Sequence, residues 1–121
     1  MTLEQLYCSI GSESDYLDVL RRFTGEALVK RFVIKFLQDP SFASLEKALE
    51  EGNAEEAFRA AHTLKGVCLN LGFVALYGPS SALTESLRGL VISDEADGLF
   101  ASVRLQYEKL IEAINKLDSD A

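Results

Sequence analysis

Apolar residues recur at spacings of three and four along almost the whole chain of 121 residues. This spacing places them along one side of an α-helix, and the strict alternation expected of a half-buried strand is missing. Four helices of useful length with short connections are most simply arranged as an antiparallel bundle. The sequence therefore predicts an all-α fold, an antiparallel four-helix bundle with short N-terminal helices.

Capping residues and glycines divide the chain into helices. Asn53 and Glu56 have the spacing of a capping box, and Gly72 is a helix stop. The expected helices cover residues 2–7, 14–24, 26–38, 39–51, 53–71, 73–88 and 93–117. Gly78-Pro79 lies inside one of them and predicts a kink or a restart, because an interior proline loses a backbone hydrogen bond. We expect a single domain over residues 1–121, with the N-terminal helices in 1–24 and the bundle over about 25–118.

The second helix needs an N-terminal cap, and the turn before it contains several candidates. Gly11-Ser12-Glu13-Ser14 has the composition of a turn, so Ser14 or Asp15 is expected to cap the helix. The Asp39-Pro40 pair is a start signal for a later helix, with the aspartate as N-cap and the proline in the first helical position.

The charge of the chain argues against several classes of partner. Twelve Lys and Arg against 19 Asp and Glu give a net charge of −7, which disfavours sequence-independent nucleic-acid binding. No apolar run reaches the length of about 20 residues that spans a bilayer, and the first residues carry no signal for export. We expect a cytoplasmic monomer that binds neither nucleic acid nor membrane. Two cysteines, Cys8 and Cys68, and one histidine are too few for a metal site.

The single histidine, His62, lies on the helix expected over residues 53–71. The apolar side of that helix is formed by Ala57, Ala60, Ala61, Leu64, Val67, Cys68 and Leu71. On a helical wheel His62 points roughly 160° away from the middle of this arc, towards water. Gly66 follows one turn later on the same face, where a mid-helix glycine costs about 1 kcal/mol relative to alanine.

Four further residues surround this outward face. Lys65 and Arg59 lie three residues to either side of His62, within reach of the space above the imidazole. Phe58 and Leu69 lie on the same flank, and they either contact a partner or pack against a neighbouring helix. An exposed histidine, a glycine that leaves space and local cations suit a partner that carries phosphate. The alternative is an ordinary surface histidine among solvated charges.

Phosphoryl transfer requires fewer accompanying groups around a lone histidine than acid–base catalysis does. A general acid or base needs a cleft and an orienting partner, and no nucleophile motif or phosphate-binding loop accompanies His62. Neutral imidazole has a lone pair near physiological pH. The transition state for phosphoryl transfer is loose, so positioning and charge neutralisation dominate, and a partner protein can supply the metal.

The run Ala61-His62-Thr63-Leu64-Lys65-Gly66, followed by Asn70-Leu71-Gly72, resembles the histidine-containing phosphotransfer (HPt) domains of bacterial phosphorelays. The resemblance extends over residues 15–118, through Arg22–Gly25, Lys35–Phe42 and Leu83–Arg88. Leu69 is bulkier than the pattern suggests, and Gly78-Pro79 is expected to interrupt the helix that follows.

This resemblance implies a role for each residue on the outward face of the helix. His62 would be phosphorylated, at Nε2, by the aspartate of a response-regulator receiver domain or of a hybrid histidine kinase, and would pass the group to another receiver. Lys65 would steady the phosphoryl charge and Gly66 would leave room for the receiver. Phe58, Arg59 and Leu69 would bind the partner. No cofactor is expected on this chain, because the Mg²⁺ would lie on the receiver.

Three other functions fit less well. In the dimerisation helix of a histidine kinase an acidic residue usually follows the histidine, whereas Thr63 follows here, and no nucleotide-binding domain fits in the remaining length. We therefore expect a phosphocarrier without kinase activity of its own. A helical adaptor that binds a partner through the His62 face without covalent chemistry is the main alternative. A metal-binding or hydrolytic role comes third.

Overall fold

The structure is a computed structural model that describes residues 1–117. In this range it contains only helices and their connections, which confirms the predicted all-α fold. The helices are α1 (Leu3–Ile10), α2 (Glu13–Phe23), α3 (Glu26–Lys35), the short 3-10 helix η1 (Phe36–Gln38), α4 (Ser41–Glu50), α5 (Ala54–Leu71), α6 (Val74–Leu87) and α7 (Ala96–Asn115). The predicted end of the bundle at residue 118 lies outside the described residues.

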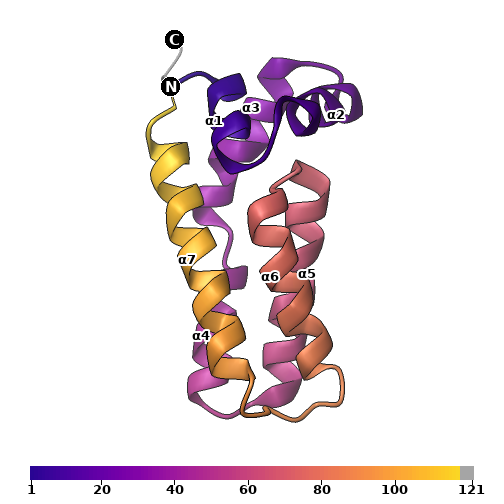
Figure 1. The fold of residues 1–121 in the computed structure, drawn as a ribbon, viewed down its shortest axis with the longest axis vertical. Coiled ribbons are helices and arrows are strands. Elements are labelled where there is room, and N and C mark those ends of the chain that lie inside the picture. Colours follow the sequence, from indigo (N-terminus) through magenta and orange to yellow (C-terminus); the bar gives the residue numbers. More distant parts are fainter. Residues whose placement is uncertain (118–121) are drawn as a thin grey trace.

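Helices α4 to α7 run side by side and form the bundle (Figure 1). The central helix α5 packs against α4 and α6, and α6 packs against α7. The core between them is made of small and aliphatic side chains from all four helices, including Leu45, Ala57, Ala61, Leu64, Leu76, Leu83, Val103 and Leu110. The seven residues predicted for the inner side of α5 lie there, Val67 only half-buried and the others buried.

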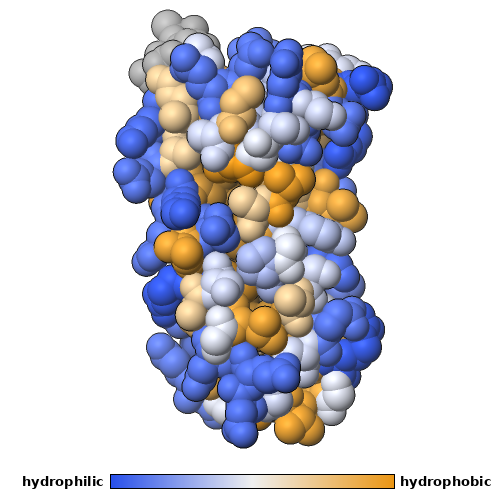
Figure 2. All heavy atoms as spheres, in the orientation of Figure 1, coloured by the Kyte–Doolittle hydropathy of each residue, from blue (hydrophilic) through white to orange (hydrophobic). Residues whose placement is uncertain are grey.

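Helices α1 to α3 gather at the end of the bundle where α5 stops and α6 starts (Figure 1). The buried hydroxyl of Tyr7 in α1 donates a hydrogen bond of 2.6 Å to the backbone carbonyl of Leu71 at the end of α5. The ring of Tyr7 also lies 6.1 Å from that of Phe73. On the face shown in Figure 2, hydrophobic side chains reach the surface near the junction between these helices and the bundle. The N-terminal helices thus share one core with the bundle.

The predicted starts of α2 and α7 differ from the structure. The hydroxyl of Ser12, not Ser14 or Asp15, caps α2, and Asp15 supplies the acceptor of the capping box for the backbone N–H of Ser12. Helix α7 begins at Ala96 and not at residue 93 or 94, with a helical turn at Ser93–Ala96 in front of it. Several residues in each turn can cap a helix, so the pattern alone did not choose between them.

Gly78-Pro79 does not interrupt α6, and a predicted restart there was wrong. The helix runs from Val74 to Leu87 with Pro79 inside it. A proline normally crowds the Cβ of the residue before it. Gly78 has no Cβ, which relieves this part of the crowding, and the helix continues although Pro79 has no N–H to donate to the carbonyl one turn back.

The start of α4 lies one residue later than predicted, because Pro40 and not Asp39 is the N-cap. The carboxylate of Asp39 still accepts a hydrogen bond of 2.9 Å from the backbone N–H of Ser41. Pro40 precedes the first regular residue of the helix, Ser41.

Candidate functional site

Helix α5 presents His62 to solvent in the middle of its length. The side-chain oxygen of Asn53 caps the helix by accepting a hydrogen bond of 3.1 Å from the backbone N–H of Glu56. Ala61 and Leu64, on either side of His62, are both fully buried and fix the rotation of the helix. His62 is consequently exposed on the opposite side, as the sequence predicted.

Open space surrounds the position of Gly66, one turn beyond His62. No atom lies within 4 Å of the place that a Cβ would occupy there. The glycine is therefore not required by packing within this chain, and it leaves one side of His62 free for an approaching molecule.

On the other side, His62 stacks on an aromatic side chain. The rings of Phe58 and His62 have centroids 6.0 Å apart and planes inclined by 14°. Phe58 is half-buried and packs against the core, so it also makes contacts inside the protein. Of the two possibilities left open for Phe58, packing within the chain therefore applies, and contact with a partner stays a prediction.

Helix α6 adds two charged residues that the sequence analysis did not assign to the site. The guanidinium of Arg88 lies over the ring of Phe58, 5.6 Å from its centroid. Glu85 accepts two hydrogen bonds from Arg88, one of 3.0 Å from Nε and one of 2.7 Å from a terminal nitrogen. Phe58 thus connects this ion pair to His62. The run Leu83–Arg88 was part of the family resemblance, but nothing in its spacing placed it beside Phe58.

Lys65 lies close enough to this pair to affect it electrostatically. The hydrogen bond from Arg88 lowers the pKa of Glu85, and the positive charges of Arg88 and Lys65 lower that pKa further. The half-buried Lys65 and the exposed Arg88 therefore place two positive charges near one carboxylate on the His62 side of α5 and α6.

The second predicted cation, Arg59, is oriented differently. Its guanidinium donates a hydrogen bond of 2.7 Å to Glu56 and approaches Glu55 at 3.4 Å, both towards the start of α5. In this arrangement the carboxylates of Glu55 and Glu56 offset the charge of Arg59 at the start of α5 and not beside His62.

Leu69 lies beyond Gly66 on the exposed side of α5, with 57% of its surface accessible. It borders a groove of about 280 Å³ that α2 and α6 also line, through residues such as Asp18 and Val74. Arg22 of α2 donates hydrogen bonds of 2.7 and 2.8 Å to the carbonyls of Leu69 and Asn70. The N-terminal helices therefore hold the end of α5 that carries Leu69.

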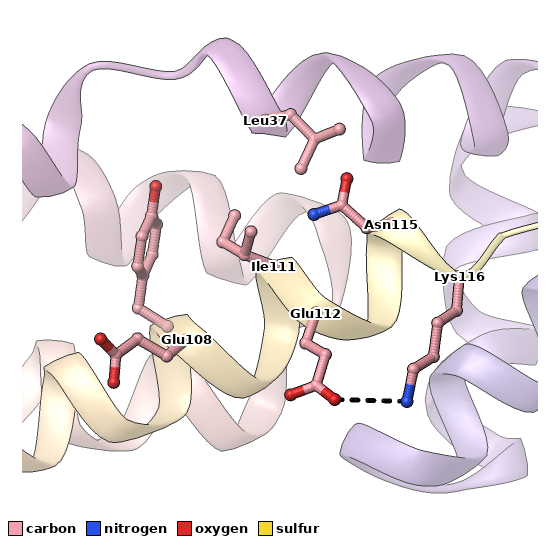
Figure 3. A pocket seen from close by; sticks show the side chains of 7 residues that line it. Leu37, Glu108, Ile111, Glu112, Asn115 and Lys116 are labelled. Atoms are coloured by element: carbon pink, nitrogen blue, oxygen red, sulfur yellow. Dashed lines mark ion pairs between the residues drawn. The ribbon is translucent and has the colours of Figure 1, made fainter.

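A separate pocket of about 510 Å³ lies between η1 and the C-terminal half of α7 (Figure 3). Leu37 and Ile111 form its apolar part, and Glu112 pairs with Lys116 at 3.3 Å at its rim. None of the residues around His62 lines this pocket.

Within residues 1–117, no group of three or more His, Cys, Asp or Glu side chains is placed to hold a metal ion. Within the same range no helix combines the length and the hydropathy that crossing a membrane requires.

Similarity to a known protein family assigns the chain to a class. The family model described as the Hpt domain matches residues 37–117, about two-thirds of the chain. The chain belongs to the Hpt domain family. No curated protein and no solved structure gave a match.

Membership of the Hpt domain family connects the chain to phosphotransfer in two-component systems. Hpt domains are phosphocarrier modules rather than kinases, and they interact with receiver domains and kinases. The matched region includes α4 to α7 and every residue described around His62. It begins after α1 to α3, which precede the matched region in the chain.

Proposed function

We propose that this chain is a phosphorelay intermediate that carries a phosphoryl group on His62. It accepts the group from the aspartate of one receiver domain and passes it to the aspartate of another. The exposure of His62 in the middle of α5, beside open space at Gly66, is the observation that supports this proposal most strongly. A receiver needs that access, because its aspartyl phosphate must come into line with the imidazole.

The transfer needs no acid or base from this chain. With its proton on Nδ1, His62 attacks the phosphorus through the lone pair of Nε2. The N–P bond forms as the O–P bond of the aspartyl phosphate breaks, and the receiver's carboxylate leaves with its negative charge. The reverse sequence on a second receiver returns His62 to its neutral form. Mg²⁺ bound by the receiver offsets the charge of the phosphoryl group during both steps.

The residues around His62 have separate roles in this proposal. Lys65 steadies the charge on the phosphoryl oxygens, and Gly66 keeps the approach of the receiver clear. Phe58 and Leu69 offer apolar contact to the receiver on either side of His62, and Arg59 offers a charged contact near the start of α5. The chain has no kinase activity of its own and binds no cofactor. We expect it to act in the cytoplasm as a monomer.

Incubation with a phosphorylated receiver domain tests the proposal. The expected result is phosphate on the chain that is labile in acid and stable in alkali, which is the behaviour of a phosphohistidine. His62→Gln should remove this phosphate completely while the chain stays folded. If phosphate appears on His62→Gln as well, another residue is the acceptor.

A non-covalent helical adaptor is the competing function, and the exposed Leu69 beside its groove would suit one. The same experiment separates the two functions. Binding of receivers without any phosphate on the chain, with every cognate receiver tried, would favour the adaptor.

A further inference from the structure

The ion pair between Glu85 and Arg88 is linked to His62 through the ring of Phe58. Arg88 is held by two hydrogen bonds to Glu85 and rests over the ring of Phe58, which in turn stacks on His62. Both charged side chains remain more than half exposed, at 56% each. An exposed ion pair is weak, so Arg88 can exchange its partner at little cost.

Phosphorylation of His62 changes the balance of charge at this place. Without phosphate, one carboxylate faces the positive charges of Lys65 and Arg88. A phosphoryl group brings a charge of about −1.5 to −2 and three strong acceptor oxygens. A guanidinium forms bidentate hydrogen bonds with such oxygens as readily as with a carboxylate.

We infer that Glu85 competes with the phosphoryl group on His62 for Arg88, and that this competition limits the lifetime of the phosphohistidine. Glu85 holds Arg88 while His62 is free. After phosphorylation Arg88 turns from Glu85 to the phosphoryl oxygens, and the carboxylate of Glu85 stays nearby as a rival acceptor for the guanidinium. The inference rests on the proposed function, since it concerns the same phosphohistidine.

A small phosphodonor tests this without a receiver. His62 attacks the phosphorus of phosphoramidate through Nε2, the P–N bond of the donor breaks and ammonia leaves. In the decay that follows, water attacks the phosphorus, the bond to Nε2 breaks, inorganic phosphate leaves and His62 regains its lone pair. The half-life of the phosphorylated chain after removal of the donor, followed by ³¹P NMR, is the quantity to compare.

Four variants give the expected pattern. Glu85→Gln should lengthen the half-life at least about threefold and Arg88→Gln should shorten it by a similar factor. In the double variant the effect of Glu85→Gln should disappear, because Glu85 acts through Arg88. The matched control is Glu112→Gln, which removes the same charge from the Glu112–Lys116 pair on α7 and should leave the half-life unchanged.

The side chain of Arg88 provides an independent measurement. Its Nε signal in ¹⁵N NMR should move on phosphorylation of the wild-type chain and stay in place in His62→Gln treated in the same way. An unmoved signal in the phosphorylated wild type would contradict the exchange of partners.

Two results with the variants would also overturn the inference. One is a half-life in Glu85→Gln that equals or falls below that of the wild type. The other is a full effect of Glu85→Gln in the Arg88→Gln background, which would mean that Glu85 acts by charge alone. Failure of a receiver to phosphorylate the chain would instead contradict the proposed function, and the half-lives measured with phosphoramidate would still decide the role of Glu85.

Discussion

A histidine on the outer side of a packed helix can gain a phosphoryl group without moving the core. His62 has this position because Ala61 and Leu64, its buried neighbours, fix which side of α5 faces inwards. The imidazole contributes a stacking contact with Phe58 and little else to the fold. Its chemistry and the stability of the chain are therefore separable.

Replacing His62 tests this separation. His62→Gln should change the free energy of unfolding by no more than about 0.5 kcal/mol, as surface substitutions usually do, and should abolish phosphate acceptance. Thermal unfolding and phosphorylation by phosphoramidate measure the two effects. A melting temperature lowered by many degrees would show that the side chain supports the fold.

Lys65 should influence the phosphohistidine without being required for its formation. Its ammonium can offset charge on the phosphoryl oxygens, but it does not form the new bond. We expect Lys65→Ala to slow transfer from a receiver, or to shorten the life of the phosphohistidine, while phosphate is still accepted. Wild-type rates and lifetimes at low salt, where screening is weakest, would remove Lys65 from the site.

At Gly66, stability and function should change in opposite directions. Gly66→Ala should stabilise the chain by up to about 1 kcal/mol, because the position is helical and a Cβ meets no atom within 4 Å. Gly66→Gln should keep or raise the melting temperature, while transfer from a receiver should fall at least tenfold, since a displacement of about 1 Å can cost a hundredfold in rate.

Phosphoramidate is the control for Gly66→Gln, because it reaches His62 without docking. It should modify the variant as fast as the wild type. Equal losses with both donors would assign Gly66 to the chemistry of His62 itself, and no loss with either donor would take it out of the site.

The sequence identified the site residues that share one helix and missed those on the next. The positions of His62, Lys65 and Gly66 follow from the spacing of buried residues in α5, which sets the rotation of that helix. Arg88 and Glu85 reach the site only because α6 packs on α5 in one particular register. Spacing within α6 does not reveal that register.

At the scale of elements, the close contact between α5 and α2 depends on Gly72. This residue ends α5 with φ of +70°, a conformation that glycine adopts at little cost. A Cβ there would lie 2.5 Å from Cγ2 of Val19 in α2. The sequence predicted the helix stop but not the neighbour that excludes a side chain.

Gly72 and Gly52 form a matched pair for testing this contact. Gly52 has the same φ of +70°, but a Cβ there meets nothing within 4 Å. Gly52→Ala should destabilise the chain by about 1–2 kcal/mol through the backbone alone. Gly72→Ala should cost at least about 1 kcal/mol more, because it adds overpacking against Val19. Denaturant unfolding measures the free energy of unfolding of both variants. Equal losses would show that α2 moves away from the added Cβ without a further loss of stability.

Helix boundaries were predictable where one residue stood out and less so where several competed. Asn53 and Gly72 fixed both ends of α5 correctly. At α2 the sequence predicted Ser14 or Asp15 as the N-cap in place of Ser12, because all three side chains can cap a helix. Pro79 was expected to cause a kink or a restart, and α6 passes through it without a break.

At the scale of the whole molecule, α1 to α3 precede the region that matches the Hpt family and yet share its core. Tyr7 and Val19 are fully buried against the end of the bundle near Leu71 and Phe73. A chain without residues 1–24 would expose this apolar surface to water. The N-terminal helices are therefore expected to be needed for the stability of the bundle.

Deleting residues 1–24 should lower the melting temperature by well over 10 °C or cause aggregation, since a shift of about 4 °C accompanies each kcal/mol in a domain of this size. The single substitution Tyr7→Phe removes only the hydrogen bond to Leu71 and should cost about 1–2 kcal/mol. An unchanged melting temperature in the shortened chain would mean that the matched region folds independently of α1 and α2.

The central claim is that His62 carries a phosphoryl group between two receivers. Its most direct test mixes one phosphorylated receiver, a second unphosphorylated receiver and the chain, and follows labelled phosphate with time. We predict that label appears first on the chain and then on the second receiver, and that neither occurs with His62→Gln. Transfer to the second receiver that proceeds equally with His62→Gln, or without label ever reaching the chain, would contradict the claim.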